Sequence, residues 1–118
     1  MKEDRIYLLH IRDALERILL YTAHDKQAFF VDSRTQDAVI RNLEVVGEAV
    51  KNLSDGLKAR HATVPWKRIA GMRDKMIHEY FGVNLQLVWA AIEQEVPGLQ
   101  QKIEAILGER DEGCRSED

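Results

Sequence analysis

Residues 35–53 read TQDAVIRNLEVVGEAVKNL, and this stretch decides the fold class. Five apolar residues recur in it at alternating steps of four and three positions: Val39, Leu43, Val46, Val50 and Leu53. That spacing places them on one face of an α-helix, as a seam that packs against other helices. Gly47 lies beside the seam. Because glycine costs a helix about 1 kcal/mol relative to alanine, its presence indicates that another helix approaches closely there.

Helical periodicity of apolar residues extends over most of the chain. We expect helices over about residues 4–23, 35–53, 65–81, 85–96 and 99–107, with no pattern over residues 57–64. Asp25 is expected to cap a short helical segment that runs to Phe30, and Asp32 or Ser33 and Asn84 are further N-cap candidates. No β-alternation, internal repeat or glycine-rich phosphate loop is present. The sequence therefore predicts an all-α bundle of four or five helices.

Length and composition fit one soluble domain. The chain has 118 residues, of which 45% are hydrophobic and 31% are charged. No apolar run approaches the ~20 residues that span a bilayer, and the acids Glu3 and Asp4 are unlike the start of a signal peptide. We therefore expect a helical domain over residues 1–107, a disordered acidic tail over residues 108–118, and a cytoplasmic location without membrane contact.

The cysteine and histidine residues do not indicate a metal site. Cys114 is the single cysteine, so it forms neither an internal disulfide nor a zinc site. Neither His10 nor His24 has another metal-ligand residue four positions away, and we interpret both as surface histidines. We expect no metal and no cofactor.

Basic residues are concentrated in one segment. The chain has a net charge of −3, but residues 58–78 hold six basic residues and one acid, so this segment is +5 and the remainder is −8. A basic surface on an acidic body can still guide a polyanion, although an ordinary solvated helix face has the same composition.

One short segment combines several groups that can take part in catalysis or binding: Arg73-Asp74-Lys75-Met76-Ile77-His78-Glu79-Tyr80. An arginine binds phosphate, a histidine moves protons near neutral pH, and a tyrosine stacks or donates a hydrogen bond. Asp74 and His78 are four residues apart and therefore adjacent on a helix. Arg73 and His78 are about 140° apart on an ideal helix. Either Arg73 bends across, or the helix loosens near Tyr80, or a second subunit completes the site.

These residues resemble a known family. Arg73-x4-His78-x-Tyr80 matches the R-x4-H-x-Y motif of HepT-like toxins in the HEPN superfamily. The flanking sequence is similar too, with Val64-Pro65-Trp66 before the motif and Tyr80-Phe81-Gly82-Val83 with Trp89 after it. Residues 37–49, hereafter the second signature, resemble another family segment. The resemblance covers about residues 4–107.

The resemblance implies a HEPN-like helical homodimer in which the motif helices face one another across a cleft. It implies a metal-independent endoribonuclease that is the toxin of a type VII-like toxin–antitoxin pair. It also implies a cognate antitoxin, a minimal nucleotidyltransferase that transfers AMP to the motif tyrosine, Tyr80. Many family members carry asparagine after the motif arginine, whereas this chain has Asp74.

The motif residues permit this chemistry. RNA carries its own nucleophile, the 2′-hydroxyl, so His78 can act as a general acid or base while Arg73 stabilises charge on the phosphoryl oxygens. Asp74 would orient His78, and Tyr80 would stack a base or bond a phosphate. Lys67, Arg68 and Lys75 are the candidate RNA contacts.

Two other classes of function fit the same sequence. One is a non-catalytic helical subunit that binds substrate or nucleotide for a nucleotidyltransferase. The other is a purely structural dimerisation domain. Cleavage of RNA by the purified chain separates the enzyme from both.

Overall fold

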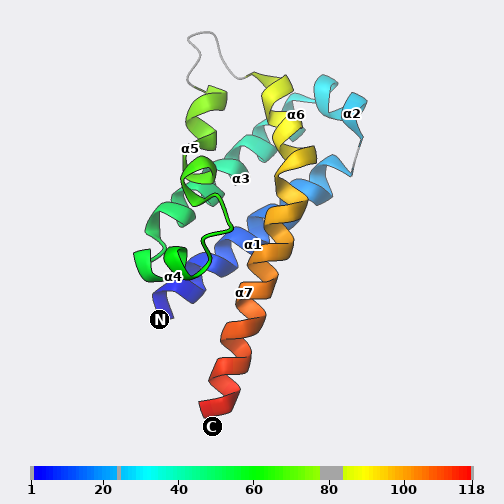
Figure 1. Ribbon diagram of the computed structural model, residues 1–118. Coiled ribbons are helices and arrows are strands. Elements are labelled where there is room, and N and C mark those ends of the chain that lie inside the picture. The colour runs from blue at the N-terminus through cyan, green and yellow to red at the C-terminus, as the bar shows by residue number, and fades with distance from the viewer. Residues whose placement is uncertain (1, 24, 78–83, 118) are drawn as a thin grey trace.

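A computed structural model of the chain describes residues 2–23, 25–77 and 84–117, with side chains for residues 3–23, 25–72 and 84–109. These residues form seven helices and no strand (Figure 1). The helices are α1 (Lys2–Thr22), α2 (Lys26–Val31), α3 (Ser33–Asn52), α4 (Asp55–Arg60), α5 (Trp66–Ile77), α6 (Leu85–Gln94) and α7 (Val96–Glu117). Five are long and two have six residues each, so the predicted all-α bundle is confirmed.

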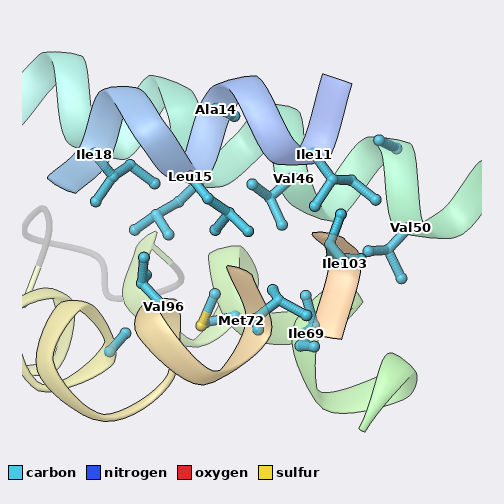
Figure 2. Close-up of a cluster of buried hydrophobic side chains, with 14 of the residues drawn as sticks. Ile11, Ala14, Leu15, Ile18, Val46, Val50, Ile69, Met72, Val96 and Ile103 are labelled. Carbon is cyan, nitrogen blue, oxygen red and sulfur yellow. The ribbon is translucent and has the colours of Figure 1, made fainter. Parts of the chain in front are cut away.

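The core lies where four of the long helices meet. Helix α3 has its longest contact with α1 and also packs on α5, while α7 packs against α1. Figure 2 shows side chains from these four helices pointing into one cluster. Every residue of the α3 seam is buried: Val39, Leu43, Val46, Val50 and Leu53. Burial of such a side chain contributes about 1.5–3 kcal/mol, so this face holds the bundle together.

The predicted N-caps are confirmed. Asp25 and Asn84 each accept a hydrogen bond from the backbone N–H three residues ahead, at 3.0 and 3.2 Å. Asp32 accepts from the backbone N–H of Arg34 at 3.0 Å and from the hydroxyl of Thr35 at 2.9 Å. The Thr35 hydroxyl is the main cause that holds the pKa of Asp32 below its usual value, since it favours the charged carboxylate.

Helix α4 is not expected from the sequence, because residues 57–64 show no helical pattern of apolar residues. Ser54 caps this helix by accepting from the N–H of Leu57 at 3.2 Å. Ser54 is itself held by the buried carboxylate of Asp4, which accepts from its N–H at 2.8 Å and from its hydroxyl at 2.6 Å. The partner that fixes the start of α4 is thus 50 residues away, and local periodicity does not reveal it.

The C-terminal helix is longer than expected. The helical structure is interrupted between α6 and α7, as the position of Pro97 predicts. Pro97 itself lies in the first turn of α7, where proline is tolerated. Residues 108–117 were expected to be disordered, but their backbone continues α7 to Glu117. The division of the chain at residue 107 stays a prediction. Lys102 of α7 donates to the carbonyl of Thr63 at 3.1 Å, which ties α7 to the connection before α5.

Gly47 is a point of close approach between α3 and α5. A Cβ atom added there would lie 3.4 Å from the carbonyl oxygen of Ala70 and 3.8 Å from that of Ile69. The neighbours are backbone atoms of α5, which cannot move away as a side chain can. The predicted close approach of another helix at Gly47 is therefore confirmed.

Two substitutions at Gly47 test this contact. Gly47→Ala should change the free energy of unfolding by no more than about 1 kcal/mol, because its methyl group fits and alanine favours the helix. Gly47→Leu should destabilise the chain by about 1–3 kcal/mol, because a larger side chain forces α5 off α3. Urea denaturation followed by circular dichroism measures both. Equal stability of the two variants would show that α3 and α5 do not meet as described.

Candidate functional site

The start of the motif helix α5 is anchored firmly. Trp66 is buried, and its Nε1 donates to the carbonyl oxygens of Lys58 at 3.2 Å and His61 at 3.0 Å. Ile69 and Met72 on the same helix are buried in the common core (Figure 2). The aromatic residue of the Val64-Pro65-Trp66 segment therefore fixes both the start of α5 and the preceding turn.

The first part of the predicted motif, from Arg73 to Ile77, lies at the other end of this helix. The backbone of α5 is helical to Ile77, so Arg73, Asp74 and Lys75 lie on its final turns. Their side chains, and all of His78 and Tyr80, lie outside the described residues. The adjacency of Asp74 and His78, and the separation of about 140° between Arg73 and His78, stay predictions.

A cavity of about 400 Å³ lies where α1, α3 and α5 meet. Gly47 and Glu48 of the second signature line it, together with Ala70 of α5. Arg73 follows Ala70 by three positions, so its Cα lies about one turn further along, on nearly the same side of the helix. The structure thus brings the second signature to the helix that carries the motif, although more than 20 residues separate them. We take this cavity, hereafter the α1–α3–α5 cavity, as the candidate substrate site.

The polar lining of the α1–α3–α5 cavity carries both signs of charge. Arg41 and Lys51 supply cations, Glu44 and Glu48 supply carboxylates, and Arg41 lies 3.9 Å from Glu44. Cations of this kind can bind phosphate, and carboxylates can accept hydrogen bonds from hydroxyl or amino groups. A polar ligand with a phosphate is therefore a better match for this lining than an apolar one.

None of the residues that line this cavity was predicted as a site residue, and two of them come from α1. Tyr7 and His10 of α1 line it, with their rings edge to face at a centroid distance of 6.2 Å. His10 is exposed, in agreement with its interpretation as a surface histidine. The sequence gives no signal for these two residues, because more than 60 positions separate them from the motif and only packing of α1 on α3 brings them near.

The candidate RNA contacts differ in their surroundings. Lys67 is exposed on the first turn of α5. Arg68 is also exposed, but its Nη2 donates to Glu95 Oε2 at 2.8 Å, so its guanidinium already forms an ion pair with a carboxylate. Lys75 belongs to the residues whose side chains are outside the described part. Arg68 can therefore contact a phosphate only in competition with Glu95.

Glu95→Gln tests this competition. The change removes the negative charge beside Arg68 and keeps the size of the side chain, so RNA affinity should rise about 2- to 5-fold. The slope of log affinity against log salt should steepen by about 0.7, the value for one more phosphate contact on a single strand. Filter binding at several salt concentrations measures both. Glu104→Gln, at an exposed position of α7, is the matched control, and equal behaviour of the two variants would contradict the expectation.

The described residues form neither a metal-binding cluster nor a membrane-spanning helix. In residues 2–23, 25–77 and 84–117, no group of three or more histidine, cysteine, aspartate or glutamate side chains is placed to hold a metal ion. Over the same ranges, no helix combines the length and the apolar character needed to cross a membrane.

Comparison with known proteins connects this chain to a family. Residues 11–106 match the profile of a family described as ribonuclease HepT-like. A protein of Caldanaerobacter subterraneus subsp. tengcongensis, provisionally named as an RNase, is 45% identical over 111 residues, which are 91% of this chain and 96% of that protein. A protein of Thermococcus cleftensis, provisionally named ribonuclease HepT, is 42% identical over 106 residues, which are 89% of this chain and 96% of that protein.

One relative is longer. A Methanocaldococcus jannaschii protein, named as a gamma-glutamylcyclotransferase and provisionally as an RNase, is 41% identical over 111 residues. These residues are 93% of this chain but 50% of that protein, so the chain spans about half the length of this relative. No solved structure matches the chain.

Proposed function

This chain belongs to the ribonuclease HepT-like family, and from that premise we propose that it is a toxin that cleaves RNA in the cytoplasm as a metal-independent endoribonuclease. The observation that carries the proposal is the family match over residues 11–106, which includes Arg73, His78 and Tyr80. The α1–α3–α5 cavity supports it, because residues of the second signature and of the motif helix meet there.

In the proposed reaction the 2′-oxygen of a ribose attacks the adjacent phosphorus while the bond from phosphorus to the 5′-oxygen breaks. His78 takes the proton from the 2′-hydroxyl or gives one to the leaving 5′-oxygen, and the His78 of the second subunit or a water molecule makes the other transfer. Arg73 donates hydrogen bonds to the phosphoryl oxygens, where negative charge develops. No metal is needed to generate the nucleophile, since the substrate carries it. Asp74 orients His78, and Lys67, Arg68 and Lys75 attract the phosphate backbone.

Catalysis can be tested with a chelator and two variants. The purified chain should cleave RNA in the presence of EDTA. Arg73→Ala should reduce the rate about 10²–10³-fold and His78→Ala about 10²–10⁴-fold, because each removes one transition-state interaction. Circular dichroism should show unchanged helical content. Loss of cleavage on chelation, or normal cleavage by both variants, would contradict the proposed mechanism, and RNA binding without cleavage would favour a non-catalytic subunit.

We further propose that a minimal nucleotidyltransferase acts as the antitoxin by transferring AMP to Tyr80. The tyrosine oxygen attacks the α-phosphorus of ATP, pyrophosphate leaves, and the hydroxyl proton passes to solvent or a base. An AMP group on Tyr80 adds negative charge and bulk at a position close in sequence to Arg73 and His78. That charge would repel the phosphates of RNA, as phosphorylation does at other anion sites.

The modification has a direct readout. Incubation with the nucleotidyltransferase and ATP should add one or more AMP units to Tyr80, and the modified chain should lose RNA cleavage. Tyr80→Phe should escape modification because it lacks the hydroxyl nucleophile. Intact-mass and peptide mass spectrometry measure the adduct. An adduct on Tyr7 or Tyr21, the other tyrosines of the chain, would count against Tyr80 as the target.

The spacing of the motif supports a homodimer. On a regular helix Arg73 and His78 are about 140° apart, so one chain does not present both groups on one stripe. A two-fold axis close to the motif helices would bring the arginine of one subunit near the histidine of the other. The basic segments of both subunits, at +5 each, would then flank one groove.

Mixing experiments test whether the subunits share a site. Arg73→Ala and His78→Ala chains should each be inactive, and a mixture that has exchanged subunits should regain part of the activity. At equal amounts about half of the dimers are mixed, so recovery of up to roughly a quarter of the wild-type rate is expected if one intact site per mixed dimer suffices. Size-exclusion chromatography with light scattering should show a dimer. A monomeric, fully active chain would refute the shared site.

A further inference from the structure

A second cavity, of about 280 Å³, lies between α2 and α6. Its lining combines the aromatic rings of Phe30 and Trp89 with the polar side chains of Lys26, Gln86 and Glu93. The function proposed above gives no role to these residues. We refer to it as the α2–α6 cavity.

The aromatic wall of this cavity is held in place by packing. Trp89 lies 5.3 Å from Phe29 and 6.5 Å from Phe30 between ring centroids, and Phe29 and Phe30 meet edge to face at 5.4 Å. Phe29 and Trp89 are buried, whereas Phe30 is half-buried and keeps part of its ring accessible. Phe30 is therefore a fixed ring with a free surface, as a stacking platform for a planar ligand requires.

The wall also holds an unused donor. Nε1 of Trp89 is buried and has no hydrogen-bond partner within the part of the chain that the structure describes. The indole N–H of Trp66, by contrast, donates to two carbonyl oxygens. Because this Nε1 atom is enclosed by protein, Trp89 offers a ligand in the cavity its ring and not its N–H.

The rim of the cavity carries three different polar groups on exposed side chains. Lys26 supplies a cation, Gln86 an amide that both donates and accepts, and Glu93 a carboxylate that only accepts. A nucleotide matches two of these groups together with the ring: a planar base for Phe30, a phosphate for Lys26, and an exocyclic amino group for Glu93. Carboxylates accept in this way from the amino group of cytosine.

The α2–α6 cavity is connected to the motif helix in two ways. Asn84, the cap of α6, is six residues after His78, so the backbone between them spans at most about 20 Å. A smaller cavity of about 180 Å³ lies between α5 and α6, and it shares Ala90 and Gln94 with the α2–α6 cavity. A surface therefore leads from α5 across α6 to α2, and a few nucleotides of an extended strand would cover it.

We infer that the α2–α6 cavity is a base-binding subsite for single-stranded RNA, and that it selects a base with an exocyclic amino group. The base stacks on Phe30, its amino group donates to Glu93, and the adjoining phosphate contacts Lys26. Uracil carries a carbonyl oxygen in place of the exocyclic amino group, and this acceptor is repelled by the carboxylate of Glu93, so uracil is the disfavoured base. The inference rests on the proposed function only for the class of ligand, RNA.

The test compares two labelled single-stranded octamers, oligocytidine and oligouridine. Fluorescence anisotropy is measured with the full chain carrying His78→Ala, so that the oligomers are not cut. Oligocytidine should bind roughly tenfold more tightly than oligouridine. Adding Glu93→Gln should bring the ratio of the two affinities close to one, because the amide no longer selects a donor. Glu104→Gln, on α7 away from this cavity, should leave the ratio unchanged.

A second variant reports on stacking. Phe30→Leu should weaken both oligomers about five- to tenfold, since it removes the ring and keeps an apolar side chain. Circular dichroism checks that this variant folds, and if it does not, the exposed Glu93 variant decides alone. An equal affinity of the His78→Ala chain for both oligomers, or a ratio that survives Glu93→Gln, would overturn the inference.

The same preparations distinguish this inference from the proposed function. Cleavage of RNA by the chain with His78 intact, combined with equal binding of the two oligomers, would leave the proposed function standing and reject the subsite. Absence of both cleavage and RNA binding would reject the two together. Discrimination without cleavage would retain the subsite and identify the chain as an RNA-binding module.

Discussion

The contact between the backbones of α3 and α5 at Gly47 is the constraint on which the rest of the structure depends. Because position 47 has no side chain, the carbonyl oxygens of Ile69 and Ala70 reach the surface of α3. Helix α5 can then bury Ile69 and Met72 in the core that α1, α3 and α7 also line (Figure 2). Since short helices owe most of their stability to such packing, the position of the motif helix depends on a small residue at this contact.

The α1–α3–α5 cavity is a consequence of the same contact. Glu48 follows Gly47 directly and lines the cavity from α3, while Ala70 lines it from α5. The close approach that shapes the core therefore also brings the second signature beside the helix of Arg73. A helix bundle of this size has little interior to spare for a site, so polar groups gather at the outer rim of the helix junction instead.

The two faces of the proposed enzyme would have separate tasks. The motif end of α5 and the α1–α3–α5 cavity offer charged groups that suit phosphate chemistry. The α2–α6 cavity offers a ring and a carboxylate, which suit recognition of a base. Phosphate contacts position a nucleic acid without reading it, so a site for one base would add the selectivity that a basic helix lacks.

The sequence alone determined the long helices and most of their limits, but not α4 or the C-terminal part of α7. A helical seam such as Val39 to Leu53, and caps such as Asp25 and Asn84, are encoded within a few residues, because a helix repeats every 3.6 residues and a cap bonds three residues ahead. The motif from Arg73 to Tyr80 was equally readable. The tertiary structure decided the start of α4, where Asp4 holds Ser54, and both cavities. Those features join side chains from helices far apart in the chain, and only packing brings such residues into contact.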